Sequence, residues 1–410
     1  MKNFSLDSKI ILKNLSYLSI MRFFNIGIKF LLVGYLVRVF GEFGYGQITW
    51  VDSIIQYFVL FINFGFNIYA SKRIVELSGD KDALNEIVSS IYIIKTGLFI
   101  ISFVILLLLM FNSKINALSS FFFIYLLTGV GEIFYPIWFF QGMERMRAAT
   151  IVIFISRILI LILTFLFVKD ISDINLYLWI LVLSGLVLAV LSVYILRTSF
   201  QIEFVKVSFN KLKKILNDSK LYFWGRAMNL AFNSITIFVI GYAFTMEDVT
   251  IFDISSKLVM VALIPFDMLQ QAVFPTITRT LNKKLLKQII KYTFLLSLVI
   301  LLIFNIFANE LLFLMGGENL REHVTVLKVL SLLIPIVALV FVLGSTTLVA
   351  FGFEKEFNYS LIFSTIVYLL LLSGLFVMDA LTFWNIIILR VIAEFIILLI
   401  RGYYTLKLVF

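Results

Sequence analysis

The sequence predicts an all-α polytopic membrane protein with twelve transmembrane helices. Hydrophobic residues make up 62% of the 410 residues and charged residues only 14%, whereas soluble globular domains contain about 45–50% apolar residues. The chain is also divided into apolar stretches that approach the roughly 20 residues needed to cross a bilayer. In chain order, the predicted spans are 14–39, 46–70, 86–111, 117–140, 147–168, 174–196, 219–243, 249–275, 288–309, 325–351, 357–378 and 382–406.

The first span is predicted to be retained as a helix. It is too long for the apolar segment of a cleavable signal peptide, and it carries Arg22 and Lys29. These cations are seven residues apart, which is close to two helical turns, so both project from one helix face. A cation at bilayer depth costs at least about 2.5–3.5 kcal/mol on insertion scales, so it persists where it is paired or faces a wet protein interior.

The basic residues between the spans predict the orientation. Outside the spans or near their ends, 22 Lys and Arg residues fall at the N-terminus, in the even-numbered loops and at the C-terminus, against five in the odd-numbered loops. By the positive-inside rule, both termini are predicted to be cytoplasmic, with Lys169 and His323 outside. Anionic lipid on the cytoplasmic side accounts for the net charge of +10, so no nucleic acid partner is expected.

The longest basic loop divides the chain into two predicted lobes of six helices, residues 1–205 and 206–410. Short matches recur in the same order in both halves, and six helices per half make the repeat parallel, with the cargo route between the halves. The matched segments are Arg22–Asn25 with Arg226–Asn229, Ile93–Lys95 with Ile289–Lys291, and Gly142–Arg145 with Gly352–Lys355.

Two prolines lie in spans that correspond in this repeat. Pro136 is in the fourth span and Pro335 in the tenth. Each removes a backbone hydrogen bond and tends to kink its helix. Static shaping of the bundle is one interpretation, and a pair of hinges for alternating access is the other.

Some intramembrane charges have candidate partners nearby. Asp253 with Lys257, and Arg390 with Glu394, are spaced i,i+4, so each pair is predicted to neutralise itself within one helix.

Lys95 and Arg157 could share Glu132 across neighbouring helices. For these two cations, the structural and the ligand-binding interpretations stay open.

Arg22, Lys29 and Arg226 have no opposite charge within helical reach, so they are the first candidates for binding an anionic cargo. A guanidinium fork binds two phosphate oxygens at once, which suits a diphosphate. Further candidates for substrate binding are Lys95, Arg157 and Lys257. The candidates for H⁺ or Na⁺ coupling are Asp52, Glu132 and Asp267.

No metal site or other cofactor is expected. The chain has no cysteine, and His323 is its single histidine. One imidazole without cysteine or acidic partners does not make a metal site.

Four segments have a distinctive combination of residues: Leu36–Gly46, Ser53–Tyr57, Asn63–Asn67 and above all Pro136–Met146. Together they resemble the Wzx-type O-antigen flippases, in the polysaccharide-transport branch of the multidrug/oligosaccharidyl-lipid/polysaccharide exporter superfamily. Gly34 and Arg145 depart from the family, many of whose members have proline and lysine there.

The resemblance implies two six-helix lobes around a central cavity in the bacterial cytoplasmic (inner) membrane. It also implies that an undecaprenyl-diphosphate-linked oligosaccharide repeat unit is moved from the inner to the outer leaflet. Membrane lipids, a polysaccharide polymerase and a chain-length regulator are the further expected partners. The alternatives are a multidrug antiporter of the same superfamily and a membrane-embedded polymerase or glycosyltransferase. The basic first span and the short outer loops argue against them, so no enzyme is expected.

Overall fold

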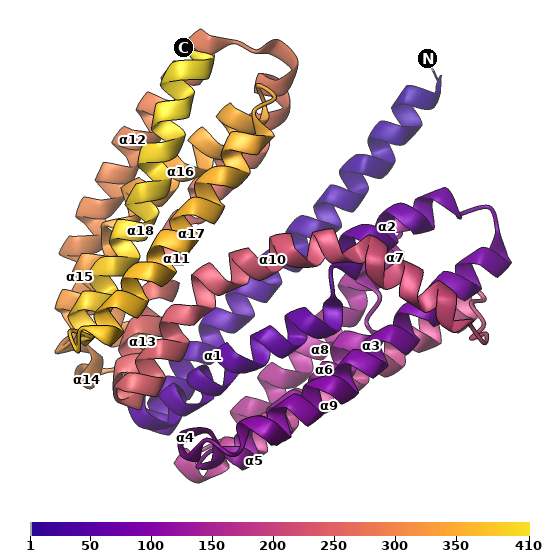
Figure 1. Ribbon diagram of the computed structural model, residues 1–410, viewed down its shortest axis with the longest axis horizontal. Coiled ribbons are helices and arrows are strands. Elements are labelled where there is room, and N and C mark those ends of the chain that lie inside the picture. Colours follow the sequence, from indigo (N-terminus) through magenta and orange to yellow (C-terminus); the bar gives the residue numbers. More distant parts are fainter. Residues whose placement is uncertain (1) are drawn as a thin grey trace. The chain divides into compact units, whose positions relative to one another are not determined.

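The protein is built from helices, as a computed structural model shows (Figure 1). The structure describes Lys2–Phe410, except the side chains of residues 2–26, 29, 229, 231 and 233. Within this described part there is no strand, and ten helices are long and apolar enough to cross a membrane. The predicted all-α membrane class is therefore confirmed, while the number of twelve spans, the two six-helix lobes and the cytoplasmic termini stay predictions.

The chain forms two compact units, Met1–Leu230 and Ala231–Phe410. The helices of the first unit are α1 (Lys2–Asn63), α2 (Phe66–Glu76), α3 (Lys81–Leu109), α4 (Ser113–Asn116), α5 (Ser119–Leu126), α6 (Gly129–Phe134), α7 (Ile137–Gly142), α8 (Met146–Phe167), the 3₁₀ turn η1 (Ile171–Asp173), α9 (Ile174–Ser199) and the first part of α10 (Phe209–Ala243).

Helix α1 contains the first predicted span and residues 46–63 of the second, which ends within α2. The loop expected between them is replaced by a kink at Gly41, whose backbone angles are φ 68° and ψ 177°. Side-chain-bearing residues rarely adopt a positive φ, so glycine permits this change of direction without a longer loop. A kink keeps the hydrogen-bonded helix almost continuous, which is why the first predicted span and most of the second appear as one element.

The fourth predicted span is divided into α5, α6 and α7. Pro136 lies in the break between α6 and α7 with φ −92° and ψ 63°, as expected for a residue that has no N–H to donate. Gly131 of α6 packs directly on α9, because a Cβ added there would lie 2.9 Å from the Cα of Gly185. These small residues let α6 and α9 approach closely.

The basic loop after α9 is an ordered strap along α3. The Glu203 N–H donates to Asn85 Oδ1 at 2.9 Å, and the Val205 N–H donates to Ser89 Oγ at 2.9 Å. Asn85 and Ser89 are both buried. Two polar residues of a membrane helix thus hold the extended segment 200–207 against the first unit.

The second unit contains the rest of α10 and the helices that follow. In Figure 1, α12, α16, α17 and α18 lie side by side, in agreement with the contacts of α16 with α12 and α18, and of α17 with α18. The elements are α11 (Met246–Thr280), α12 (Lys283–Ile306), α13 (Ala308–Gly316), α14 (Glu318–Arg321), α15 (Val324–Ser331), α16 (Leu333–Phe341), the π-helix η2 (Val342–Val349), α17 (Glu354–Val377), α18 (Phe383–Tyr404) and the π-helix η3 (Thr405–Val409).

The tenth predicted span is also interrupted. It comprises α15, α16 and η2, with Pro335 near the start of α16. Proline cannot donate to the carbonyl four residues earlier, which belongs to Ser331 at the end of α15. The break between α15 and α16 follows from that missing hydrogen bond.

Candidate functional site

A network of polar side chains lies inside the membrane helices of the first unit, and Lys95 of α3 is its most buried member. Its side chain is 0% exposed. The ammonium donates to Asn63 Oδ1 at 2.9 Å and to the backbone oxygen of Glu132 at 2.8 Å. Both acceptors are neutral, so the positive charge of Lys95 is solvated by dipoles rather than neutralised by direct contact with a carboxylate.

Asn63, at the end of α1, connects Lys95 to the carboxylate of Glu132. Its Nδ2 donates to Glu132 Oε2 at 3.1 Å and to the backbone oxygen of Val59 at 3.0 Å, while its Oδ1 accepts from Lys95. The structure therefore brings Lys95 and Glu132 together, as the sequence suggested, but through an amide bridge and a main-chain oxygen. Asn63 was not among the predicted site residues, although an amide within an apolar span was a usable signal.

A second acidic group of the first unit, Asp52 of α1, is held by two donors. Its Oδ1 accepts from Gln56 Nε2 at 2.8 Å and from the Tyr125 hydroxyl at 2.7 Å. Gln56 is one turn along the same helix, whereas Tyr125 belongs to α5. Neither donor was predicted from the sequence.

Arg157 of α8 belongs to the same electrostatic environment. It is half-buried. The Tyr125 hydroxyl lies in the electrostatic field of both Arg157 and Asp52. The Tyr135 hydroxyl lies in the field of both Arg157 and Glu132. Two cations and two carboxylates of the predicted site are thus near one another in the first unit.

The three cations predicted first for the anion lie on α1 and α10. Arg226 is exposed on α10, and its charge acts on Lys95. The side chains of Arg22 and Lys29 lie outside the described residues, so their part in a diphosphate site stays a prediction.

The two i,i+4 ion pairs predicted for the second unit are confirmed. Lys257 Nζ lies 2.5 Å from Asp253 Oδ2, and Arg390 Nη2 lies 3.0 Å from Glu394 Oε1. The Arg390 guanidinium also stacks on the ring of Phe232 at 4.2 Å. The Lys257 side chain is 34% exposed, and its part in substrate binding stays a prediction.

Asp267, the third candidate for ion coupling, has different surroundings. It lies on α11 of the second unit and accepts from Gln271 Nε2 at 3.1 Å. Gln271 is exposed, and Asp267 is only half-buried. Asp52, in contrast, is held by donors from α1 and α5.

Arg401 is a buried cation in the last turn of α18, and it was not among the predicted site residues. The structure places it inside the second unit at 6% exposure. Its Nε donates to Ser360 Oγ at 3.0 Å and its Nη1 to the backbone oxygen of Val340 at 2.7 Å. The guanidinium stacks on Phe357 at 4.4 Å. Val340 lies just before the π-helix η2, so Arg401 braces an irregular part of the bundle.

The described residues contain no group of three or more His, Asp or Glu side chains that could hold a metal ion.

Comparison with known proteins now identifies the family. Residues 11–281 match the protein family described as polysaccharide biosynthesis protein. The chain belongs to this family. The resemblance seen in the sequence motifs is thereby confirmed at the level of the family.

Individual relatives extend the match over most of the chain. A candidate O-antigen transporter of Escherichia coli (strain K12) is 26% identical over 370 residues, which are 88% of this chain and 89% of the relative. A candidate O-antigen transporter of Shigella dysenteriae is 26% identical over 274 residues, covering 65% of this chain and 67% of the relative.

Solved structures show the same fold. An inward-facing multidrug resistance MATE family transporter of the MOP superfamily aligns with a TM-score of 0.75 at 15% identity, covering 97% of this chain and 98% of that one. The lipid II flippase MurJ aligns with a TM-score of 0.70 at 12% identity, covering 96% and 87%. The polysaccharide biosynthesis family member described here is therefore a multi-pass bacterial membrane protein with a transporter fold, and not an enzyme.

Proposed function

We propose that this protein moves an undecaprenyl-diphosphate-linked oligosaccharide repeat unit across the bacterial cytoplasmic membrane, from the inner to the outer leaflet, by alternating access. The observation that carries the proposal is the match to a candidate O-antigen transporter over 88% of this chain and 89% of that relative. A match of that extent includes the membrane helices of both units. The fold of the lipid II flippase MurJ is compatible with a lipid-linked cargo.

The charges in the first unit support an anionic cargo. Lys95 and Arg157 lie within membrane helices. Arg226 is exposed on α10, close enough for its charge to act on Lys95. We propose that Arg226, with Arg22 and Lys29, binds the diphosphate through charge-assisted hydrogen bonds. Lys95 is fully buried and already bonded, so its proposed role is to sustain the positive field and position Glu132.

The membrane potential can supply part of the driving force. An anion that moves outward across an inside-negative membrane gains about 2.3 kcal/mol per charge per 100 mV. Coupling to H⁺ or Na⁺ is the proposed second source, with Asp52 and Glu132 as the groups that would exchange the ion. Both are carboxylates held in place by neutral donors, which leaves their charge available to a cation.

A multidrug antiporter is the nearest alternative, because a MATE transporter shares the fold. A site for cationic drugs needs carboxylates that are open to the drug. In the described part of the first unit, Lys95, Arg157 and Arg226 instead supply positive charge, which would repel a cationic drug. This arrangement favours the lipid-linked anion. A polysaccharide polymerase and a chain-length regulator are the proposed downstream partners.

The proposal is tested by complementation of a strain that lacks its O-antigen flippase. Arg226→Ala is compared with Arg147→Ala, which removes an exposed arginine from the start of α8. Losing one charged hydrogen bond to phosphate costs about 1.5–3 kcal/mol, or roughly 10–150-fold in affinity. We expect Arg226→Ala to lose surface polysaccharide and to accumulate the lipid-linked unit at the inner leaflet, with the Arg147→Ala strain unaffected.

Two outcomes contradict parts of this proposal. If the wild-type protein fails to restore polysaccharide export in any strain of this kind, the cargo class is wrong. If the wild type restores export and Arg226→Ala does so equally well at equal membrane abundance, the cargo class stands and the basic site is wrong.

A further inference from the structure

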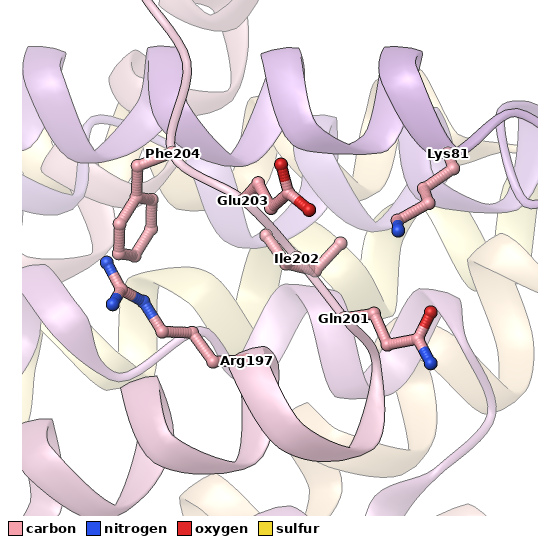
Figure 2. A pocket seen from close by; sticks show the side chains of 6 residues that line it. All are labelled: Lys81, Arg197, Gln201, Ile202, Glu203 and Phe204. Carbon is pink, nitrogen blue, oxygen red and sulfur yellow. The ribbon is translucent and has the colours of Figure 1, made fainter.

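A pocket on the first unit lies apart from the intramembrane network. Its volume is about 580 Å³, and it lies where the end of α9, the strap 200–207 and the start of α3 meet. Figure 2 shows Lys81 and Arg197 on opposite sides of the strap in this view. The lining residues are Lys81, Arg197, Gln201, Ile202, Glu203 and Phe204.

The wall of this pocket is anchored at several points. The strap is tied to α3 through the amides of Glu203 and Val205. The Ile202 side chain is 2% exposed, and its N–H donates to the Leu196 oxygen of α9 at 3.0 Å. The segment is therefore attached to both α3 and α9, and the pocket shape is largely formed before any ligand arrives.

Arg197 is oriented by an aromatic contact. Its guanidinium carbon lies 5.0 Å from the centre of the Phe204 ring, within the range of a cation–π interaction. The Phe204 ring in turn packs against Tyr92 of α3 at 5.7 Å. Stacking leaves the edge of the guanidinium, which carries its N–H donors, available to an acceptor.

The cations of the pocket exceed its acids. Lys81 and Arg197 are both exposed, and neither forms an ion pair with a described residue. Glu203 is the one carboxylate among the lining residues, and the Gln201 amide adds neutral donors. The pocket thus has an excess positive charge, polar donors and an exposed aromatic ring at the end of two membrane helices.

We infer that this pocket binds the phosphate-bearing headgroup of a membrane lipid. Lys81 begins α3 and Arg197 lies in the last turn of α9, so both are at the depth where headgroups meet water. Arg197 supplies a fork for phosphate oxygens, Lys81 a second charge, and Phe204 a surface for the adjoining glycerol or isoprenoid carbons. An acidic glycerophospholipid and a polyprenyl diphosphate share this chemistry.

The test measures lipid binding to the purified full chain by native mass spectrometry. One arm uses phosphatidylglycerol, with phosphatidylcholine as the reference lipid, and the other uses undecaprenyl diphosphate. The variants are the double substitution Lys81→Gln with Arg197→Gln, the single substitution Glu203→Gln, and a control, Lys72→Gln. Lys72 is an exposed cation of α2 that does not line the pocket.

We expect the double variant to bind phosphatidylglycerol, undecaprenyl diphosphate or both roughly 25-fold more weakly than the wild type. Each basic residue near an anionic headgroup raises the affinity about fivefold. Glu203→Gln should bind more tightly than the wild type, and Lys72→Gln should match it. Weakening in the phosphatidylglycerol arm identifies an annular lipid site. Weakening in the diphosphate arm alone identifies a cargo-loading site.

The inference is overturned if the double variant binds both lipids as Lys72→Gln does while unfolding at the wild-type temperature. It is also overturned if Glu203→Gln weakens binding. Lipid binding is measured on the purified chain without any export step, so a failed complementation test leaves this measurement interpretable.

Discussion

Lys95 Nζ donates to Asn63 Oδ1 at 2.9 Å, and this bond joins α3 to the end of α1. An ammonium has three protons to donate and no lone pair, whereas an amide both accepts and donates. Asn63 is therefore suited to stand between Lys95 and the Glu132 carboxylate, because it accepts from the first and donates to the second. The bridge holds a buried cation and a carboxylate in fixed positions without direct contact between them.

Replacing Asn63 by alanine should destabilise the protein. Lys95 would keep the backbone oxygen of Glu132 as its acceptor but lose the amide. Leaving a buried donor partly unsatisfied costs about 1–3 kcal/mol, more for a charged group. We expect a lower unfolding temperature in detergent and reduced export. The control is Asn175→Ala, at an exposed position of α9; equal unfolding temperatures for the two variants would show that the bridge contributes nothing.

Ion coupling should depend on Asp52 rather than on Asp267. Asp52→Asn removes the ionisable group with little change in shape, from a site where Gln56 and Tyr125 hold it in place. In proteoliposomes, we expect a proton or sodium gradient to stimulate flipping by the wild type and by Asp267→Asn, but not by Asp52→Asn. If flipping by the wild type responds to membrane potential but to neither gradient, ion coupling is excluded. If a gradient stimulates flipping by Asp52→Asn but not by Asp267→Asn, the coupling role belongs to Asp267.

The proline pair should affect transport more than stability. Pro136 separates α6 from α7, and Pro335 follows the break between α15 and α16. Alanine restores an N–H at each position and favours a continuous helix. We expect the variant with both Pro136→Ala and Pro335→Ala to accumulate normally in the membrane but to export polysaccharide more slowly. Wild-type export by this double variant would limit both prolines to a static, shaping role.

The predicted orientation can be tested directly, because the chain contains no cysteine and a single introduced one gives an unambiguous signal. Glu322→Cys lies beside His323 in a predicted outer loop, and Ser208→Cys lies in the predicted cytoplasmic loop; both positions are exposed. We expect a membrane-impermeant maleimide to label the first in intact spheroplasts and the second only after permeabilisation. The reverse pattern would invert the topology.

The sequence predicts contacts within one helix far better than contacts between helices. Asp253 with Lys257, and Arg390 with Glu394, were predictable because helical spacing alone places side chains four residues apart on one face. Lys95 and Asn63 are 32 residues apart in sequence, so their contact depends on how α3 packs against α1. The helical membrane class was equally predictable, because it follows from composition and from the length of the apolar runs.

The same distinction explains why the partners of Arg401 could not be predicted. The sequence places Arg401 near the end of the last predicted span and gives no indication of its acceptors. Its acceptor at Val340 is 61 residues away in sequence, and the irregular helix that exposes this carbonyl is not encoded by any local pattern of apolar residues. A π-helix leaves backbone oxygens without their usual partners, and a buried guanidinium can satisfy one of them.

Gly344 makes room for this arginine, and substituting it should disturb the second unit. A Cβ at Gly344 would overlap the Arg401 guanidinium and lie 3.0 Å from the Phe357 ring. Arg401 has little freedom to withdraw, since it is bonded to Val340 and Ser360 on other sides. Overpacking of this kind costs about 1–3 kcal/mol, so Gly344→Ala should lower the unfolding temperature.

Gly374 provides the matched control for that substitution. It lies in α17, and a Cβ there would have no neighbour within 4 Å. Gly374→Ala should leave the unfolding temperature unchanged or raise it slightly, because alanine favours a helix more than glycine does. Combining Gly344→Ala with Arg401→Lys should recover part of the loss, since an ammonium is smaller than a guanidinium and can withdraw from the added methyl. If Gly344→Ala unfolds at the same temperature as Gly374→Ala, the contact between Gly344 and Arg401 does not constrain the π-helix.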